Sequence, residues 1–282
     1  MGEIYYLNSK GEKTSLSRWP YRVKRINLQN WEWDYDAVNV GNVGGKIRRI
    51  FRNITEFEIT VTVCTQSNDP RQRLSDVVEL YEGLEYDAAV GSLGKLYVGP
   101  EYMQCFFKSS QKTTNKDLLY ALDNVFTVVS PYPMWCRDEV FNFYQFQGDT
   151  NEDGLNFPYN YPYNYSADLA KSYLENTNYR ADDFKIVIYG PVSHPRIVIG
   201  GNTYEVSADV ASGEYMVINS REKDVYKVGS TGIVTGLFNS RSKEQSVFAK
   251  IPPGKNIVLY SGGFSFDITL FHERSEPDWT LS

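Results

Sequence analysis

Hydrophobic and polar residues alternate with a period of two along residues 56–65, EFEITVTVCT. Phe57, Ile59, Val61 and Val63 fall on one side of this segment and polar residues on the other. Successive side chains of a strand point to opposite faces of the sheet, so this pattern predicts a half-buried β-strand.

The pattern changes to a helical one in residues 68–84, NDPRQRLSDVVELYEGL. Asp69 can cap a helix that starts at Pro70, because proline fits the first helical position. The apolar positions then recur at helical spacing, as Leu74, Val77, Val78, Tyr81 and Leu84. This segment predicts one amphipathic helix that lies across a sheet.

The rest of the chain is rich in short strand patterns separated by Gly, Asn, Ser and Pro. A first domain with further strands at residues 94–110 and 123–135 is expected to close near residue 140, since the prolines of SPYPMW end the run. Later strands are predicted at 184–190, 196–210, 214–220, 246–251, 256–263 and 264–273. No second amphipathic helix is available to connect parallel strands, so an antiparallel β-sandwich is predicted.

These patterns predict a mainly β protein in three parts. Residues 1–145 form an N-terminal β-barrel-like domain with one packed helix, residues 146–166 a Tyr/Pro-rich connector, and residues 167–282 a C-terminal β-sandwich. The connector is polar and carries no hydrophobic period, as expected of a linker.

Charge and length exclude several functions. The net charge of −6 leaves no basic stripe of the kind that specific nucleic-acid binding needs. No segment approaches the roughly 20 apolar residues of a membrane span, and the start, MGEIYYLNSKGEK, has no signal-peptide core. We therefore expect synthesis in the cytoplasm, no membrane partner, and free thiols at the three cysteines.

Candidate chemistry is sparse. His194 and His272 have no Cys, His or Asp at a metal-ligand spacing, and no nucleophile elbow, phosphate loop or zinc-protease motif occurs. The sequence therefore predicts no catalytic residues, no metal site, no cofactor and no enzyme activity.

Four tyrosines of the connector leave two interpretations open. Tyr159, Tyr161, Tyr163 and Tyr165 recur every two residues, so in an extended strip all four share one side. They can pack against the domains that they join, which is the preferred interpretation. Alternatively, they can stack on sugar rings, which would make the protein a carbohydrate-binding module for host cell-wall glycans.

Several segments in this order resemble the phage tail component family. They include YYLNSKGEKTSL, GKLYVGPEYMQCFF, FTVVSPYPMW, FPYNYPYNYS, IYGPVSHPRIVIGGNTYEV, GEYMVINSREKDVYKV and IPPGKNIVLYSGGFSFDITLFHERSEPDW. More closely, they look like the distal tail proteins in the baseplates of long, non-contractile-tailed phages and prophages of Gram-positive bacteria. The connector resembles the YPYDY-type connector of that family, with Asn where Asp is common.

This resemblance implies a virion structural protein that acts in host adsorption at the tail tip. Such proteins form rings, usually homo-hexamers. Their N-terminal domain makes the ring and meets the tail tube protein and the tail-associated lysin or tail fibre protein. Their galectin-like or carbohydrate-module-like sandwich projects outward and in some phages holds the receptor-binding proteins.

A closed ring needs two different complementary patches on each subunit. Two clusters of opposite charge in the first domain are candidates for the ring interface, and a solvated mixed-charge surface is the alternative. The basic cluster is Lys46, Arg48, Arg49 and Arg52, and the acidic cluster is Asp76, Glu79, Glu82 and Glu85.

Overall fold

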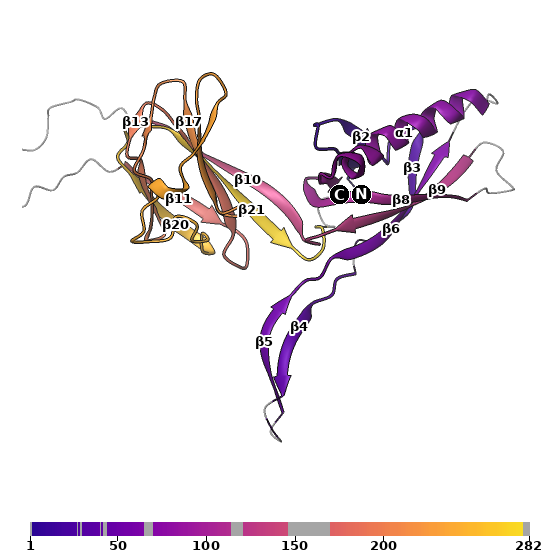
Figure 1. Ribbon diagram of the computed structural model, residues 1–282, viewed down its shortest axis with the longest axis horizontal. Coiled ribbons are helices and arrows are strands. Elements are labelled where there is room, and N and C mark those ends of the chain that lie inside the picture. Colours follow the sequence, from indigo (N-terminus) through magenta and orange to yellow (C-terminus); the bar gives the residue numbers. More distant parts are fainter. Residues whose placement is uncertain are drawn as a thin grey trace, which may run out of the picture. The chain divides into compact units, whose positions relative to one another are not determined.

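The computed structural model describes residues 2–26, 28, 30–39, 41, 44–64, 70–113, 121–145 and 170–278, and it divides into two units (Figure 1). Unit 1 comprises Met1–Arg137 and Glu273–Ser282, and unit 2 comprises Asp138–His272. The predicted boundaries differ from this division. Strand β10 (Trp135–Phe143) begins in unit 1 and ends in unit 2, and β21 (Phe266–Arg274) begins in unit 2 and ends in unit 1. Each of these two strands is therefore shared by both units. The predicted connector, residues 146–166, lies outside the described residues.

Unit 1 is a strongly curved antiparallel sheet in the order β2-β1-β7-β8-β9-β6-β3. Strand β8 gives the curvature, because it pairs with β7 as far as Cys105 and with β9 from Phe106 onward. The strands are β1 (Ile4–Leu7), β2 (Lys13–Ser15), β3 (Tyr21–Ile26), β6 (Thr55–Cys64), β7 (Gly94–Val98), β8 (Glu101–Thr113) and β9 (Ala121–Ser130). The mainly β, barrel-like character predicted for the first domain is confirmed.

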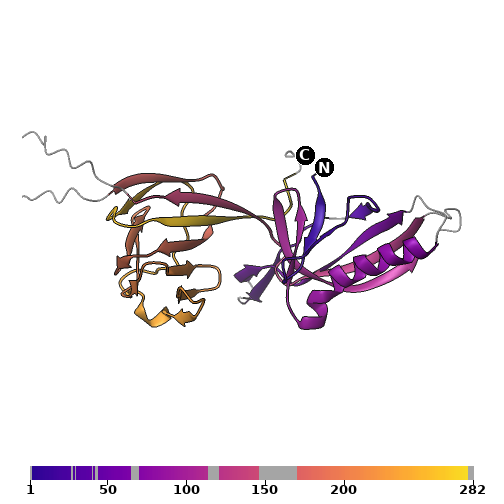
Figure 2. The same ribbon diagram turned by 90° about the horizontal axis from the view of Figure 1, so that it is seen from above.

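The α-helix of unit 1, α1 (Pro70–Val90), lies across this sheet (Figure 2). It begins at the predicted proline and buries Val77, Leu80 and Leu84 in a core that includes Ile59 and Val61 of β6. Val78, also predicted on the apolar face, is 53% exposed, because the buried stripe follows positions 77, 80 and 84. The predicted amphipathic helix is therefore confirmed, with a narrower apolar stripe.

A close contact between α1 and β2 requires glycine at position 83. A Cβ atom on Gly83 would lie 2.0 Å from Thr14 Oγ1 and 3.1 Å from Thr14 Cβ. We expect Gly83→Ala to lower the free energy of unfolding by about 1–3 kcal/mol through overpacking, although alanine favours helix by about 1 kcal/mol. Chemical denaturation measures the change. Thr14→Ala in the same chain removes the nearest atom and should restore part of the loss, and a more stable single variant would contradict this packing.

A polar contact is buried within the core of unit 1. The hydroxyl of Tyr6 donates to Asp87 Oδ2 of α1 at 2.5 Å, and the amide of Ser9 donates to Asp87 Oδ1 at 2.9 Å. Burial and then the Asp87 carboxyl raise the pKa of the Tyr6 hydroxyl, so this group keeps its proton. The contact fixes α1 on the sheet because both side chains are fully enclosed.

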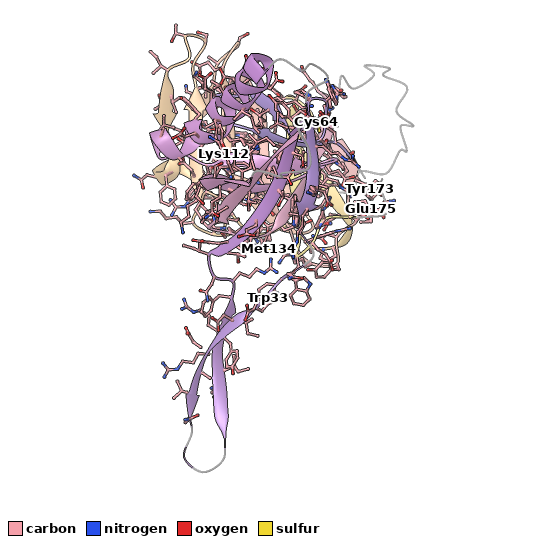
Figure 3. All side chains as sticks on the ribbon, turned by 90° about the vertical axis from the view of Figure 1, so that its right-hand side faces the viewer. Trp33, Cys64, Lys112, Met134, Tyr173 and Glu175 are labelled. Carbon is pink, nitrogen blue, oxygen red and sulfur yellow. The ribbon has the colours of Figure 1, made fainter. Side chains whose placement is uncertain are left out.

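A separate two-stranded sheet belongs to unit 1 and is named the arm here. It consists of β4 (Asp34–Asn39) and β5 (Gly45–Phe51), which pair with each other and with no other strand in the described part of the chain. Figures 1 and 3 show it extending away from the curved sheet of unit 1, with Trp33 at its base. An isolated hairpin of this kind is marginally stable in water.

Unit 2 is a β-sandwich whose apolar core lies between two antiparallel sheets. One sheet has the order β19-β18-β17-β12-β21-β10, with β12 (Asp183–Tyr189), β17 (Tyr215–Asn219), β18 (Asp224–Val228) and β19 (Val234–Gly236). The other has the order β11-β20-β14-β15, with β11 (Ala170–Asn176), β20 (Gly254–Tyr260), β14 (Arg196–Ile199) and β15 (Asn202–Glu205). A small pair, β13 (Val192–Ser193) with β16 (Asp209–Val210), and the short 3₁₀ helix η2 (Phe238–Ser240) complete the unit.

The predicted strands of unit 2 are confirmed with two exceptions. The segment 196–210 is divided into three short strands, β14, β15 and β16, by a turn at Gly200–Gly201 and a break before Asp209. Residues 246–250 form a turn and only Ile251 makes an isolated bridge, to Asp182. The two prolines that follow Ile251 limit pairing there. All strand pairs in the described ranges are antiparallel, as predicted.

Candidate functional site

The arm has one apolar face and one face that carries charged residues together with Val38 and Phe51, called the charged face here. Tyr35 lies opposite Ile50 and Ala37 opposite Ile47, which places these four side chains on the same face. Tyr35, Ile47 and Ile50 are 59%, 54% and 62% exposed. Apolar side chains gathered on an exposed surface indicate an interaction site.

The charged face of the arm carries basic residues predicted for the ring interface. Lys46 lies opposite Val38, and Arg49 lies opposite Asp36 and forms an ion pair with it at 2.8 Å. Arg48 occupies a β-bulge, where two residues of β5 face one residue of β4. Ile47 and Ile50 are three residues apart, and the extra residue at the bulge places them on the same face. The same holds for Lys46 and Arg49 on the other face.

The base of the arm is fixed to the body of unit 1 by Arg52. Its guanidinium donates to the carbonyl oxygen of Pro133 and lies 5.1 Å from the ring of Trp33. Arg52 therefore differs from the other three basic candidates, which are exposed on the arm, because it holds the arm to the chain itself.

Next to this base, strand β6 has an open edge, defined as residues Thr55–Glu58. Strand β3 ends with Ile26 opposite Ile59, whereas β6 stays paired with β9 as far as Thr55 opposite Ser130. Among the described residues, none pairs with Thr55–Glu58 on the side of β3. Half of the backbone groups of this segment thus face the open side.

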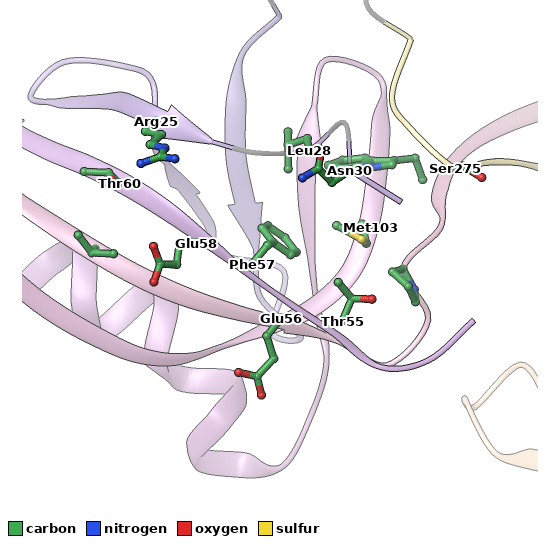
Figure 4. A pocket seen from close by; sticks show the side chains of 13 residues that line it. Arg25, Leu28, Asn30, Thr55, Glu56, Phe57, Glu58, Thr60, Met103 and Ser275 are labelled. Carbon is green, nitrogen blue, oxygen red and sulfur yellow. The ribbon is translucent and has the colours of Figure 1, made fainter. Parts of the chain in front are cut away.

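A pocket of about 470 Å³ surrounds the open edge. Figure 4 shows Phe57, Leu28 and Met103 on one side of the β6 ribbon and Glu56 and Glu58 on the other. A neighbouring pocket of about 480 Å³ is lined by Trp31, Glu32 and Arg52 among others. The open edge therefore lies in a groove with an apolar side and an acidic side.

The acidic candidates on α1 lie away from the arm within the chain. Glu79, Glu82 and Glu85 are exposed, and Asp76 is half-buried with its carbonyl oxygen accepting from the Tyr21 hydroxyl at 2.8 Å. Figure 1 shows α1 and the arm on opposite sides of the curved sheet of unit 1. Within one chain the two predicted charge clusters are therefore not brought together, and their role in a ring interface stays a prediction.

The four connector tyrosines, Tyr159, Tyr161, Tyr163 and Tyr165, lie outside the described residues. Their packing, and the alternative of a glycan platform built on them, stay predictions.

The two histidines have structural surroundings. His272 is buried between Asp182 and Glu139, with Nδ1 at 2.6 Å from Asp182 Oδ2 and Nε2 at 2.5 Å from Glu139 Oε2. His194 is exposed and its Nδ1 lies 2.9 Å from Ser193 Oγ. No group of three or more His, Cys, Asp or Glu side chains in the described part could hold a metal ion.

No helix in the described ranges is both long and apolar enough to cross a bilayer.

Comparison with solved structures identifies the fold. The chain matches the Dit protein of phage SPP1, described as a paradigm of the hub adsorption apparatus in phages that infect Gram-positive bacteria, with a TM-score of 0.62 over 96% of this chain and 98% of that one at 9% identity. The chain has the fold of a phage distal tail protein. The distal-tail fold also relates it to a chain of the phage P2 baseplate in its activated conformation with calcium, with a TM-score of 0.55 over 98% of this chain and 99% of that one at 13% identity.

The baseplate structure with strontium gives the same TM-score and coverage. No protein-family model and no curated protein matches the sequence. The predicted resemblance to distal tail proteins is thus confirmed at the level of the fold. At 9–13% identity, the comparison assigns no role to individual residues. The structural neighbours of this distal-tail fold are phage hub and baseplate proteins.

Proposed function

We propose that this protein is a structural hub at the tail tip of a long, non-contractile-tailed phage or prophage of a Gram-positive host. Copies of the chain form a ring of six, in which unit 1 makes the ring and meets the tail tube protein and the tail-associated lysin or tail fibre protein. Unit 2 serves as the attachment side for receptor-binding proteins. The observation that carries this proposal is the distal-tail fold, which covers nearly the whole of this chain and of its structural neighbours.

The arm supports self-association independently of the fold comparison. Its apolar face is exposed in the single chain, and burial of apolar surface is the main source of association free energy. Each copy of the chain would supply one arm and one receiving surface, which is the arrangement that closes into a ring.

Light scattering on the purified protein across a range of concentrations tests this proposal, with negative-stain images of the same fractions. We expect a molar mass six times the 32.4 kDa of one chain and particles with a central hole. If the isolated protein is monomeric, we expect the ring to form when the tail tube protein is added, because binding to a partner shifts the equilibrium toward the assembled state. A protein that stays monomeric in both conditions contradicts the hub.

A further inference from the structure

We propose that the open edge of β6, Thr55–Glu58, receives the arm of a second copy of this chain, with β5 of that copy adding to β6 as a further strand. This inference rests on the proposed ring and names the surfaces that form its subunit contact.

The backbones of both partners support strand addition. Among the described residues, no strand pairs with the open edge on the side where β3 ends at Ile26, and β5 is paired with β4 along one edge. A strand with unpaired N–H and C=O groups is a template for another strand, and main-chain hydrogen bonds then supply affinity. The pockets of about 470 and 480 Å³ at this edge provide the room.

The side chains of the two strands match in polarity. The groove presents Phe57, Met103 and Trp135 as apolar lining and Glu56 and Glu58 as acidic lining. Strand β5 presents Ile47 and Ile50 on one face and Lys46 and Arg49 on the other, with Arg48 in the bulge between them. A strand that enters the groove with its apolar face toward Phe57 therefore brings its basic face toward the two glutamates.

Chain connectivity indicates that the occupant comes from another copy. In each chain β5 ends at Phe51 and Arg52–Ile54 lead directly into Thr55, so a chain's own β5 runs into the open edge instead of lying beside it. One arm and one open edge per copy give a head-to-tail contact, which generates a closed ring when the rotation fits.

Glu58 and Arg48 allow the sharpest test. Glu56 already pairs with Lys108 at 2.7 Å, and Arg49 pairs with Asp36, whereas Glu58 and Arg48 form no ion pair within the described residues. Glu58→Arg or Arg48→Glu alone places like charges in contact, and we expect about tenfold weaker association or more from either. The double variant reverses both charges and should restore association to near the original level.

The experiment measures molar mass against concentration for the full chain, both single variants, the double variant and Lys243→Glu. Lys243 is an exposed residue of unit 2 and controls for the change in net charge. A photo-crosslinking amino acid in place of Ile47 adds a positional readout, with isotope-labelled and unlabelled chains mixed so that links between copies are recognised. We expect links from position 47 to the groove around Phe57 and Met103 of another copy.

The outcomes separate the two proposals. If the original protein forms rings but the double variant fails to recover, or if the links map to Glu79, Glu82 and Glu85 of α1, the ring stands and the open edge is not its contact. If the original protein forms no ring in any condition, both the hub and this contact are wrong.

Discussion

Replacement of His272 by leucine is expected to lower the free energy of unfolding by about 3 kcal/mol, because it leaves two carboxylates without their buried cation. Both ring nitrogens face carboxylate oxygens, at 2.6 Å from Asp182 and 2.5 Å from Glu139, and the imidazole is 3% exposed. Ionised carboxylates only accept hydrogen bonds, so an imidazolium with N–H on both nitrogens satisfies both contacts, in line with the raised pKa of His272. Asp182 also accepts from Asn178 Nδ2 at 2.6 Å, which fixes the carboxylate in place.

The same contact predicts how stability depends on pH. The hydrogen bond to Asp182 raises the pKa of His272, burial opposes this, and Glu139 raises the pKa further. A pKa raised in the folded state means that the stabilisation is fully present below the unfolded value of about 6.5 and is lost as pH rises through the folded pKa. The difference in stability between the original protein and His272→Leu should therefore shrink as pH rises above about 6.5.

Chemical denaturation at a series of pH values from 6 to about 10 measures this difference. His194→Asn is the matched control, because it removes the other, exposed histidine and asparagine tolerates the positive φ of 48° at that position. A stability difference that stays constant across this pH range would show that His272 acts through packing and not through its charge.

The sequence predicted the parts of the fold that bury an alternating or helical apolar pattern. Ile59, Val61 and Val63 of β6 and Val77, Leu80 and Leu84 of α1 face one core, so their periods reflect burial. The sequence does not predict the arm, because its strands pack against no core and so show no burial pattern. The charges of KIRRIF indicate a basic cluster, and the bulge at Arg48 interrupts the period of two that would indicate a strand.

The candidate contact at the open edge depends on how strands from distant parts of the chain pair, and no local sequence pattern predicts this pairing. The open edge exists because β3 ends at Ile26 while β9 continues opposite Thr55, and these partners come from distant parts of the chain. The surroundings of His272 have the same origin, since Asp182 and Glu139 lie 90 and 133 residues away in sequence. Isolated histidines and mixed charges could therefore be identified from the sequence, and their partners could not.

Shortening of the arm is expected to abolish self-association while the fold of both units is retained. Tyr35 and Ile50 lie opposite each other, so residues 36–49 can be replaced by Asn-Gly, which forms the tight turn of a two-residue hairpin. The deletion removes Ile47 and the basic residues Lys46, Arg48 and Arg49 but no residue of either core. We expect the ring to be replaced by a single chain close to 32.4 kDa less the deleted segment.

A second variant separates the apolar face of the arm from its length. Ile47→Ser with Ile50→Ser keeps the hairpin and its charges but removes two exposed apolar side chains. Full burial of each is worth about 1.5–3 kcal/mol, and loss of both should weaken association by about two orders of magnitude or more. Because these side chains are exposed in the single chain, the melting temperature of the monomer should change little for either variant. Rings that persist after the deletion would place the subunit contact elsewhere on unit 1, and the acidic face of α1 would then be the surface to mutate.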